Sequence, residues 1–135
     1  MTREPRLRLR HVPSGRLLAD RVREPRGMLG RGVGLMFQPS LPPGDGLWIS
    51  PCSGIHMVGM RFAIDAVFLD RRGRVVRVVA ALRPWRFVPF VWRAASVVEL
   101  PSGTALGAGV QRGDELRFEL GDGVRPGAEA PRDHG

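Results

Sequence analysis

The chain of 135 residues contains no lysine, no asparagine and no tyrosine, and it has a single cysteine, Cys52. All 21 basic residues are therefore arginines. One cysteine excludes an internal disulfide framework, so the fold must be held together by its core. A chain of this length can bury such a core as one domain without covalent staples.

Long hydrophobic runs are also missing. No stretch approaches the ~18 consecutive apolar residues that a membrane-spanning helix requires. The N-terminus (MTREPRLRLR) lacks the apolar segment of a secretion signal. We therefore expect a soluble, cytoplasmic protein with no membrane partner.

The formal net charge of +8 comes from arginine alone. The absence of lysine is typical of a GC-rich codon bias, which raises the arginine content without an electrostatic purpose. Nine of the 21 arginines precede residue 32, and the others are scattered rather than arranged as the stripe that a phosphate-tracking groove needs. The charge of this arginine-rich chain therefore does not lead us to expect a nucleic acid partner.

The clearest structural signal is a predicted hairpin. Residues 62–69 and 74–80 are rich in β-branched and apolar side chains, and the short segment Asp70-Arg71-Arg72-Gly73 separates them. Asp65 is the only charge inside the first of these strands. Because an isolated buried charge is very costly, we expect an arginine or a set of backbone N–H groups to bind its carboxylate. A catalytic role for Asp65 is the less favoured interpretation.

The remaining patterns predict a mainly β fold, a sandwich- or barrel-like single domain over residues 1–120 with one or two short helices. Asp20 is a suitable N-cap for a helix over residues 21–30, which we expect to be the longest helix. From residue 121 onward Gly, Pro, Ala and charged residues predominate, so we expect a disordered tail over residues 121–135. Further strands are predicted at residues 6–12, 16–19, 33–37, 47–50, 96–100 and 115–120, and a helical turn ends at Ala108.

Cys52, His56 and Met60 recur at every fourth position, and these residue types are the soft ligands that suit copper. A blue-copper site needs a second histidine, but His11 and His134 lie in the first strand and in the tail. Because an incomplete ligand set gives many false matches, we predict that the three side chains pack and that no metal or cofactor binds.

Residues 82–95 (LRPWRFVPFVWRAA) predict a long irregular loop. Two interpretations of this loop remain open. The favoured one is a lid over an open end of the β-structure, because dense exposed apolar patches are uncommon on monomers. The other is a stacking platform for a base, a peptide or an anionic ligand. The loop interleaves Trp85, Phe87, Phe90 and Trp92 with Arg83, Arg86 and Arg93.

Residues 55–70 (IHMVGMRFAIDAVFLD) resemble the signature of the DUF192 family (domain of unknown function 192). That signature runs aromatic-Trp-Met-Lys-Asn-Thr, then Ile-Pro-Leu-Asp-Ile-Ile-Phe-Leu-Asp. Here His56, Met60 and Ala63 replace its Trp, Thr and Pro, as in the branch with an Ile-His-x-x-x-Met segment. Residues 26–29 and 99–104 match two further family elements. The resemblance covers about residues 7–120, implies a compact, mainly β domain, and carries no established activity.

Three functions follow as hypotheses. The leading one is non-enzymatic binding of a small ligand or a protein partner in a cleft between residues 56–60 and the loop from Trp85 to Trp92. The alternative is a hydrolase that uses Cys52 or Asp65 with His56, although residues four apart on a strand are about 13 Å apart at the backbone. The third is nucleic acid binding through the arginine-aromatic loop. The candidate ligand-binding residues are Cys52, His56, Met60, Asp65, Trp85 and Trp92.

Overall fold

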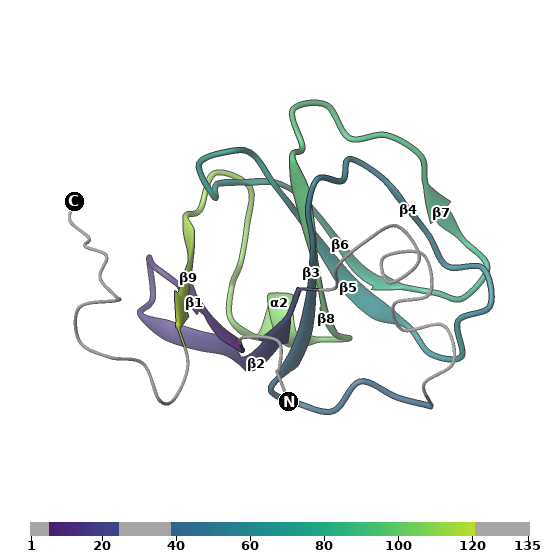
Figure 1. Cartoon of the computed structure of the whole chain (residues 1–135), viewed down its shortest axis with the longest axis horizontal. Helices are drawn as coiled ribbons and strands as arrows, with labels where there is room; N and C mark the ends of the chain where they lie inside the picture. Colours follow the sequence, from purple (N-terminus) through teal and green to yellow (C-terminus); the bar gives the residue numbers. More distant parts are fainter. Residues whose placement is uncertain (1–5, 25–38, 121–135) are drawn as a thin grey trace, which may run out of the picture.

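The computed structural model describes residues 6–24 and 39–120, which form a mainly β domain, as predicted (Figure 1). Its short helix, α2, spans Thr104–Gly107. The strands are β1 (Leu7–His11), β2 (Arg16–Arg23), β3 (Asp45–Ile49), β4 (Ile55–His56), β5 (Ile64–Leu69), β6 (Val75–Leu82), β7 (Phe87–Val88), β8 (Ser96–Pro101) and β9 (Leu116–Leu120).

Seven strands form one sheet in the order β6-β5-β8-β3-β2-β1-β9, and β4 and β7 pair separately. Neighbouring strands are antiparallel except β2 and β3, which are parallel. The two edge strands meet at one corner, where Val75 N–H donates to the Asp114 carbonyl at 2.8 Å and Leu116 N–H donates to the Gly73 carbonyl at 2.9 Å. The sheet is therefore curled into a half-barrel.

A ring contact across the concave side shows the curl directly. Trp48 on β3 stacks on Phe118 of β9, with ring centroids 4.0 Å apart, although β2 and β1 lie between their strands in the sheet. Both rings pack against one hydrophobic cluster, the inner core. The inner core comprises Leu9, Leu18, Ala19, Val22, Val67, Leu69, Val75, Val98, Leu100, Ala105, Val110 and Leu116.

The other face of the sheet carries a second cluster, the outer core. Strand β5 contributes to both, because all six of its residues are buried and alternate ones point to opposite faces. The segments that contain β4 and β7 cover the outer core. It comprises Leu41, Leu47, Ile49, Met57, Met60, Ile64, Ala66, Phe68, Leu82, Val88, Val91 and Val97.

The predicted hairpin is confirmed as β5 and β6. The turn between them is held by Asp70, whose Oδ1 accepts the N–H groups of Arg72 at 2.8 Å and Arg74 at 3.0 Å. Gly73 has a φ of 83°, the positive value that favours glycine in such a turn.

The helix predicted from residue 21 is wrong at its start. Asp20 and residues 21–23 belong to β2, and the Asp20 and Arg21 N–H groups both donate to the Gly44 carbonyl at 2.9 Å. Arg21 Nε also donates to Asp45 at the start of β3, at 2.6 Å. This parallel pairing outweighs the local capping preference of Asp20.

Three further predictions lie outside the described residues: the rest of that helix, the strand at 33–37 and the tail at 121–135. The same holds for the family-like segment 26–29. In the part of the chain that the structure describes, no helix has the length and apolar character needed to cross a membrane.

Candidate functional site

Asp65 lies on the inner-core face of β5 with no solvent exposure. Its carboxylate accepts three backbone N–H groups: Ala81 at 2.8 Å on Oδ1, and Gly103 at 3.1 Å and Ala105 at 2.8 Å on Oδ2. We expected either an arginine or a set of backbone N–H groups to bind this carboxylate, and in the structure backbone N–H groups bind it. The carboxylate thereby joins the end of β6 to the start of α2.

The two segments predicted to flank a cleft are hydrogen-bonded to each other. His56 of β4 pairs with Phe87 of β7, and Met57 exchanges hydrogen bonds with the loop, to Arg86 at 2.7 Å and from Trp85 at 2.8 Å. The His56 ring is exposed, and its Nδ1 accepts the Val58 N–H at 3.3 Å. Met60, in contrast, is buried in the outer core.

Three segments that are distant in sequence meet beside Cys52. The Cys52 N–H donates to the Ala95 carbonyl at 2.9 Å, and the Ala95 N–H donates to the Leu69 carbonyl at 2.7 Å. The Cys52 thiol donates to the Gly54 carbonyl at 2.9 Å. These bonds place residues 51–53 and 93–95 next to the turn of the central hairpin.

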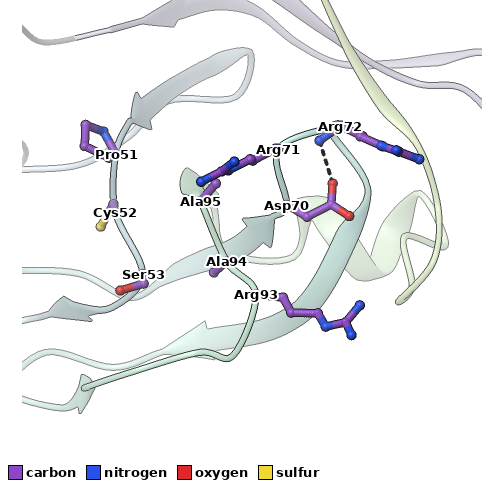
Figure 2. Close-up of a pocket in the computed structure, with 9 residues that line it drawn as sticks. All are labelled: Pro51, Cys52, Ser53, Asp70, Arg71, Arg72, Arg93, Ala94 and Ala95. Carbon is purple, nitrogen blue, oxygen red and sulfur yellow. Dashed lines mark hydrogen bonds between the residues drawn. The ribbon is translucent and has the colours of Figure 1, made fainter.

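An open cavity of about 780 Å³ lies at this junction, and it contains three arginines. Figure 2 shows that Arg71 points toward the segment between β3 and β4 that contains Pro51 and Cys52, whereas Arg72 and Arg93 point away from the thiol. The guanidinium groups therefore surround the hairpin turn and do not converge on the cysteine. The lining residues are Pro51, Cys52, Ser53, Asp70, Arg71, Arg72, Arg93, Ala94 and Ala95.

The charge of this cavity is not neutralised within residues 6–24 and 39–120. The ion pairs of that part of the chain involve Arg10, Arg21, Arg117 and His11, and none involves an arginine of the cavity. The carboxylate that lines it, Asp70, accepts backbone N–H groups of the turn. The cavity is therefore electropositive and suited to an anion.

A second hollow of about 610 Å³ shares Arg93 with the cavity; we call it the aromatic groove. Arg93 adopts a φ of 70°, a left-handed conformation that costs an arginine about 1–2 kcal/mol. Strained residues of this kind gather at functional sites. The groove is lined by Val76, Arg77, Phe90, Val91, Trp92, Arg93 and Arg112.

The loop over residues 82–95 divides its side chains between two environments. Val88 and Val91 are each only 6% exposed and pack in the outer core. Trp85, Phe87, Phe90 and Trp92 are exposed at 65%, 65%, 60% and 73% respectively. The loop thus covers the outer core through its aliphatic side chains, whereas these four aromatic rings face solvent.

Glu99 of β8 is a second buried carboxyl, and it faces the outer core between Leu47 of β3 and Ala66 of β5. Within the described ranges, its carboxylate forms neither an ion pair nor a hydrogen bond. Burial raises the pKa of Glu99 to about 7, because the charged form is poorly solvated there.

The sequence candidates are divided by this geometry. Cys52 lines the cavity and Trp92 lines the aromatic groove, whereas His56, Met60, Asp65 and Trp85 line neither. Over residues 6–24 and 39–120, no group of three His, Cys, Asp or Glu side chains could hold a metal ion.

Sequence reasoning did not select four of the arginines in these hollows. Two of them lie in the predicted hairpin turn, but no local signal brings that turn beside residues 93–95. These four residues are Arg71, Arg72, Arg77 and Arg112.

The family model of DUF192, described as "Uncharacterized ACR", matches residues 19–118. The chain belongs to the DUF192 family. Among curated proteins, none matches this chain.

Two solved structures are similar to this DUF192 domain. A protein of unknown function from Novosphingobium aromaticivorans is 22% identical, with a TM-score of 0.71 and 83% of each chain covered. A candidate transcription regulator from Sinorhizobium meliloti is 24% identical, with a TM-score of 0.72, 86% of this chain and 94% of the other covered. At these identities the likeness shows a shared fold.

Proposed function

We propose that this DUF192 domain is a non-enzymatic binding protein for a small anionic ligand, held in the cavity around Arg71, Arg72 and Arg93. The observation that carries the proposal is that three arginines line one cavity and have no carboxylate partner among the described residues. Guanidinium groups bind carboxylates and phosphates through paired hydrogen bonds. The cavity volume of about 780 Å³ is in the range of small-molecule sites.

Local geometry favours binding over hydrolysis. A hydrolase would need the Cys52 thiol directed at a base, but the thiol donates to the Gly54 carbonyl and His56 Nδ1 accepts the Val58 N–H. The Asp65 carboxylate is likewise engaged by three backbone donors. The cytoplasmic location expected from the sequence stays a prediction.

Calorimetric titration with pyrophosphate, supported by thermal shift, tests the proposal. The double variant Arg71→Gln/Arg93→Gln should bind pyrophosphate at least about tenfold more weakly than the wild type, since each charge-assisted hydrogen bond contributes roughly 1.5–3 kcal/mol. The control is Arg83→Gln/Arg86→Gln, which removes the same charge from positions that line neither hollow. If both double variants weakened binding equally, the binding would depend on net charge alone and not on the cavity, which would contradict the proposal.

A further inference from the structure

We infer that the anionic ligand is a nucleoside monophosphate, whose phosphate occupies the arginine cavity and whose base lies against Phe90 and Trp92 in the aromatic groove. This inference rests on the proposed function, because it assigns a chemical class to the ligand of the same cavity.

The first support is that the two hollows adjoin. Arg93 lines both of them, and the residues that follow and precede it in sequence continue into the cavity (Ala94) and the groove (Trp92). A ligand that fills both must therefore combine an anionic group with a second part that extends past Arg93. The strained φ of 70° at Arg93 is the backbone conformation that holds this residue between them.

The second support is the shape of the aromatic groove. Phe90 and Trp92 meet edge to face, with ring centroids 6.4 Å apart and an interplanar angle of 63°. Such a pair forms a corner in which a third flat ring can stack on one member and touch the edge of the other. Both rings are mostly exposed, at 60% and 73%, so the corner is open to a ligand. A purely ionic ligand would leave it unused.

The positive surface extends beyond the two hollows. The five arginines that line the hollows form no ion pair within residues 6–24 and 39–120. Arg10, Arg21 and Arg117 are each paired with a carboxylate, but other described arginines outside the hollows form no ion pair with described residues, among them Arg61, Arg74, Arg83 and Arg86. Because a nucleic acid strand follows a basic track along its backbone, the experiment includes one as a competing ligand.

The experiment is calorimetric titration of the full chain with adenosine monophosphate, ribose 5-phosphate and pyrophosphate. The test variant is Trp92→Leu, and the matched control is Trp85→Leu, an exposed tryptophan of the same loop that lines neither hollow. Because base stacking on an aromatic side chain strengthens binding substantially, Trp92→Leu should weaken adenosine monophosphate binding about tenfold. Pyrophosphate binding should be unchanged, and Trp85→Leu should alter neither. The wild type should bind adenosine monophosphate about tenfold more tightly than ribose 5-phosphate.

The other outcomes separate the two proposals. Equal binding of adenosine monophosphate and ribose 5-phosphate, insensitive to Trp92→Leu, would overturn the nucleotide and leave the anion site standing. Absence of binding by all three probes would overturn both proposals. A further outcome is that a single-stranded decanucleotide binds far more tightly than the mononucleotide, with an affinity that falls steeply with salt. That result would overturn the mononucleotide and identify nucleic acid as the ligand.

Discussion

Polar side chains around the inner core are mostly hydrogen-bonded or ion-paired, whereas several side chains in or under the layer over the outer core are not. We call the segments around β4 and β7 that cover the outer core the outer layer. On the inner side, Asp65 accepts three backbone N–H groups, and His11 contacts Ser14 and Asp114, each at 2.7 Å. At the nearby edge of the sheet, Arg10 pairs with Glu119. These polar groups are matched, as stability requires. The exception among the described residues is the indole Nε1 of Trp48, which is buried against the inner core without a hydrogen-bond partner.

The outer layer departs from this rule in several places. Glu99 is buried beneath it without a partner among the described residues, and Arg93 and Trp85 have positive φ values of 70° and 68°. Phe90 and Trp92 face solvent, so the apolar area that they could bury does not contribute to stability. Positive φ values are not confined to this layer, because Ala81, which donates to Asp65, has a φ of 52°. The buried Glu99 and the exposed aromatic rings distinguish the outer layer more clearly, and they direct attention to it as the functional side.

The largest expected effect is on the inner side, at Asp65. In Asp65→Asn, an amide N–H₂ must face at least one of the three backbone donors, which leaves buried groups unsatisfied. We expect a loss of about 3 kcal/mol in the free energy of unfolding and a fall in Tm of roughly 10 °C. Thermal and denaturant melts check this.

His56→Ala is the control for Asp65→Asn, because the His56 ring is exposed and the change should stay within about 0.5 kcal/mol. If His56→Ala destabilised more than Asp65→Asn, the inner side would not be the region that stability depends on.

The second expected effect concerns Glu99 and is pH-dependent. Burial raises the pKa of Glu99 from 4.5 to about 7 in the folded protein, so the folded state holds a proton that the unfolded state has released. The protonated carboxyl's contribution to stability is complete below about pH 4.5 and is lost as the pH rises to about 7. The loss amounts to about 3 kcal/mol, at 1.36 kcal/mol per unit of pKa.

Glu99→Gln should remove this pH dependence, because the amide does not titrate. Urea denaturation of both proteins between pH 4.5 and pH 8 measures the difference. Parallel stability curves for the two proteins would show that Glu99 is not buried as a lone carboxyl.

The hairpin and the environment of Asp65 could be predicted because both depend on local pattern. Two β-branched runs around an Asp…Gly turn predict a hairpin, and a charge inside the first run requires donors. The prediction of a helix after Asp20 was wrong because it rested on local pattern alone. Its capping signal was local, whereas the pairing of β2 with β3 depends on residues 44–45, more than twenty positions away.

The candidate site was only partly predictable for the same reason. Cys52 and Trp92 were selected by residue type, and each lines one of the two hollows. Arg71 and Arg112 were not selected, because the 21 arginines of the chain are spread along the sequence and hide the few that gather in space. Their grouping depends on hydrogen bonds between distant segments, such as the bond from Ala95 to Leu69. The periodicity of the sequence does not predict such bonds.

The smallest expected effect compares one arginine from each region. Arg10 makes a two-pronged contact with Glu119, at 2.9 Å and 3.2 Å, and this hydrogen bonding lowers the pKa of Glu119. Arg10→Gln should therefore destabilise the protein by up to about 1 kcal/mol at low salt, the upper range for an ion pair that is partly exposed.

Arg71→Gln removes the same charge from a cavity shared with Arg72 and Arg93, so relief of repulsion should leave stability unchanged or slightly higher. Melts at low ionic strength measure both variants. At ~1 M salt the two should converge, because the Debye length falls to roughly 3 Å and screens both effects. If Arg71→Gln instead destabilised the protein as much as Arg10→Gln, the arginines around the turn would be structural, and the division between a matched inner side and a functional outer layer would fail.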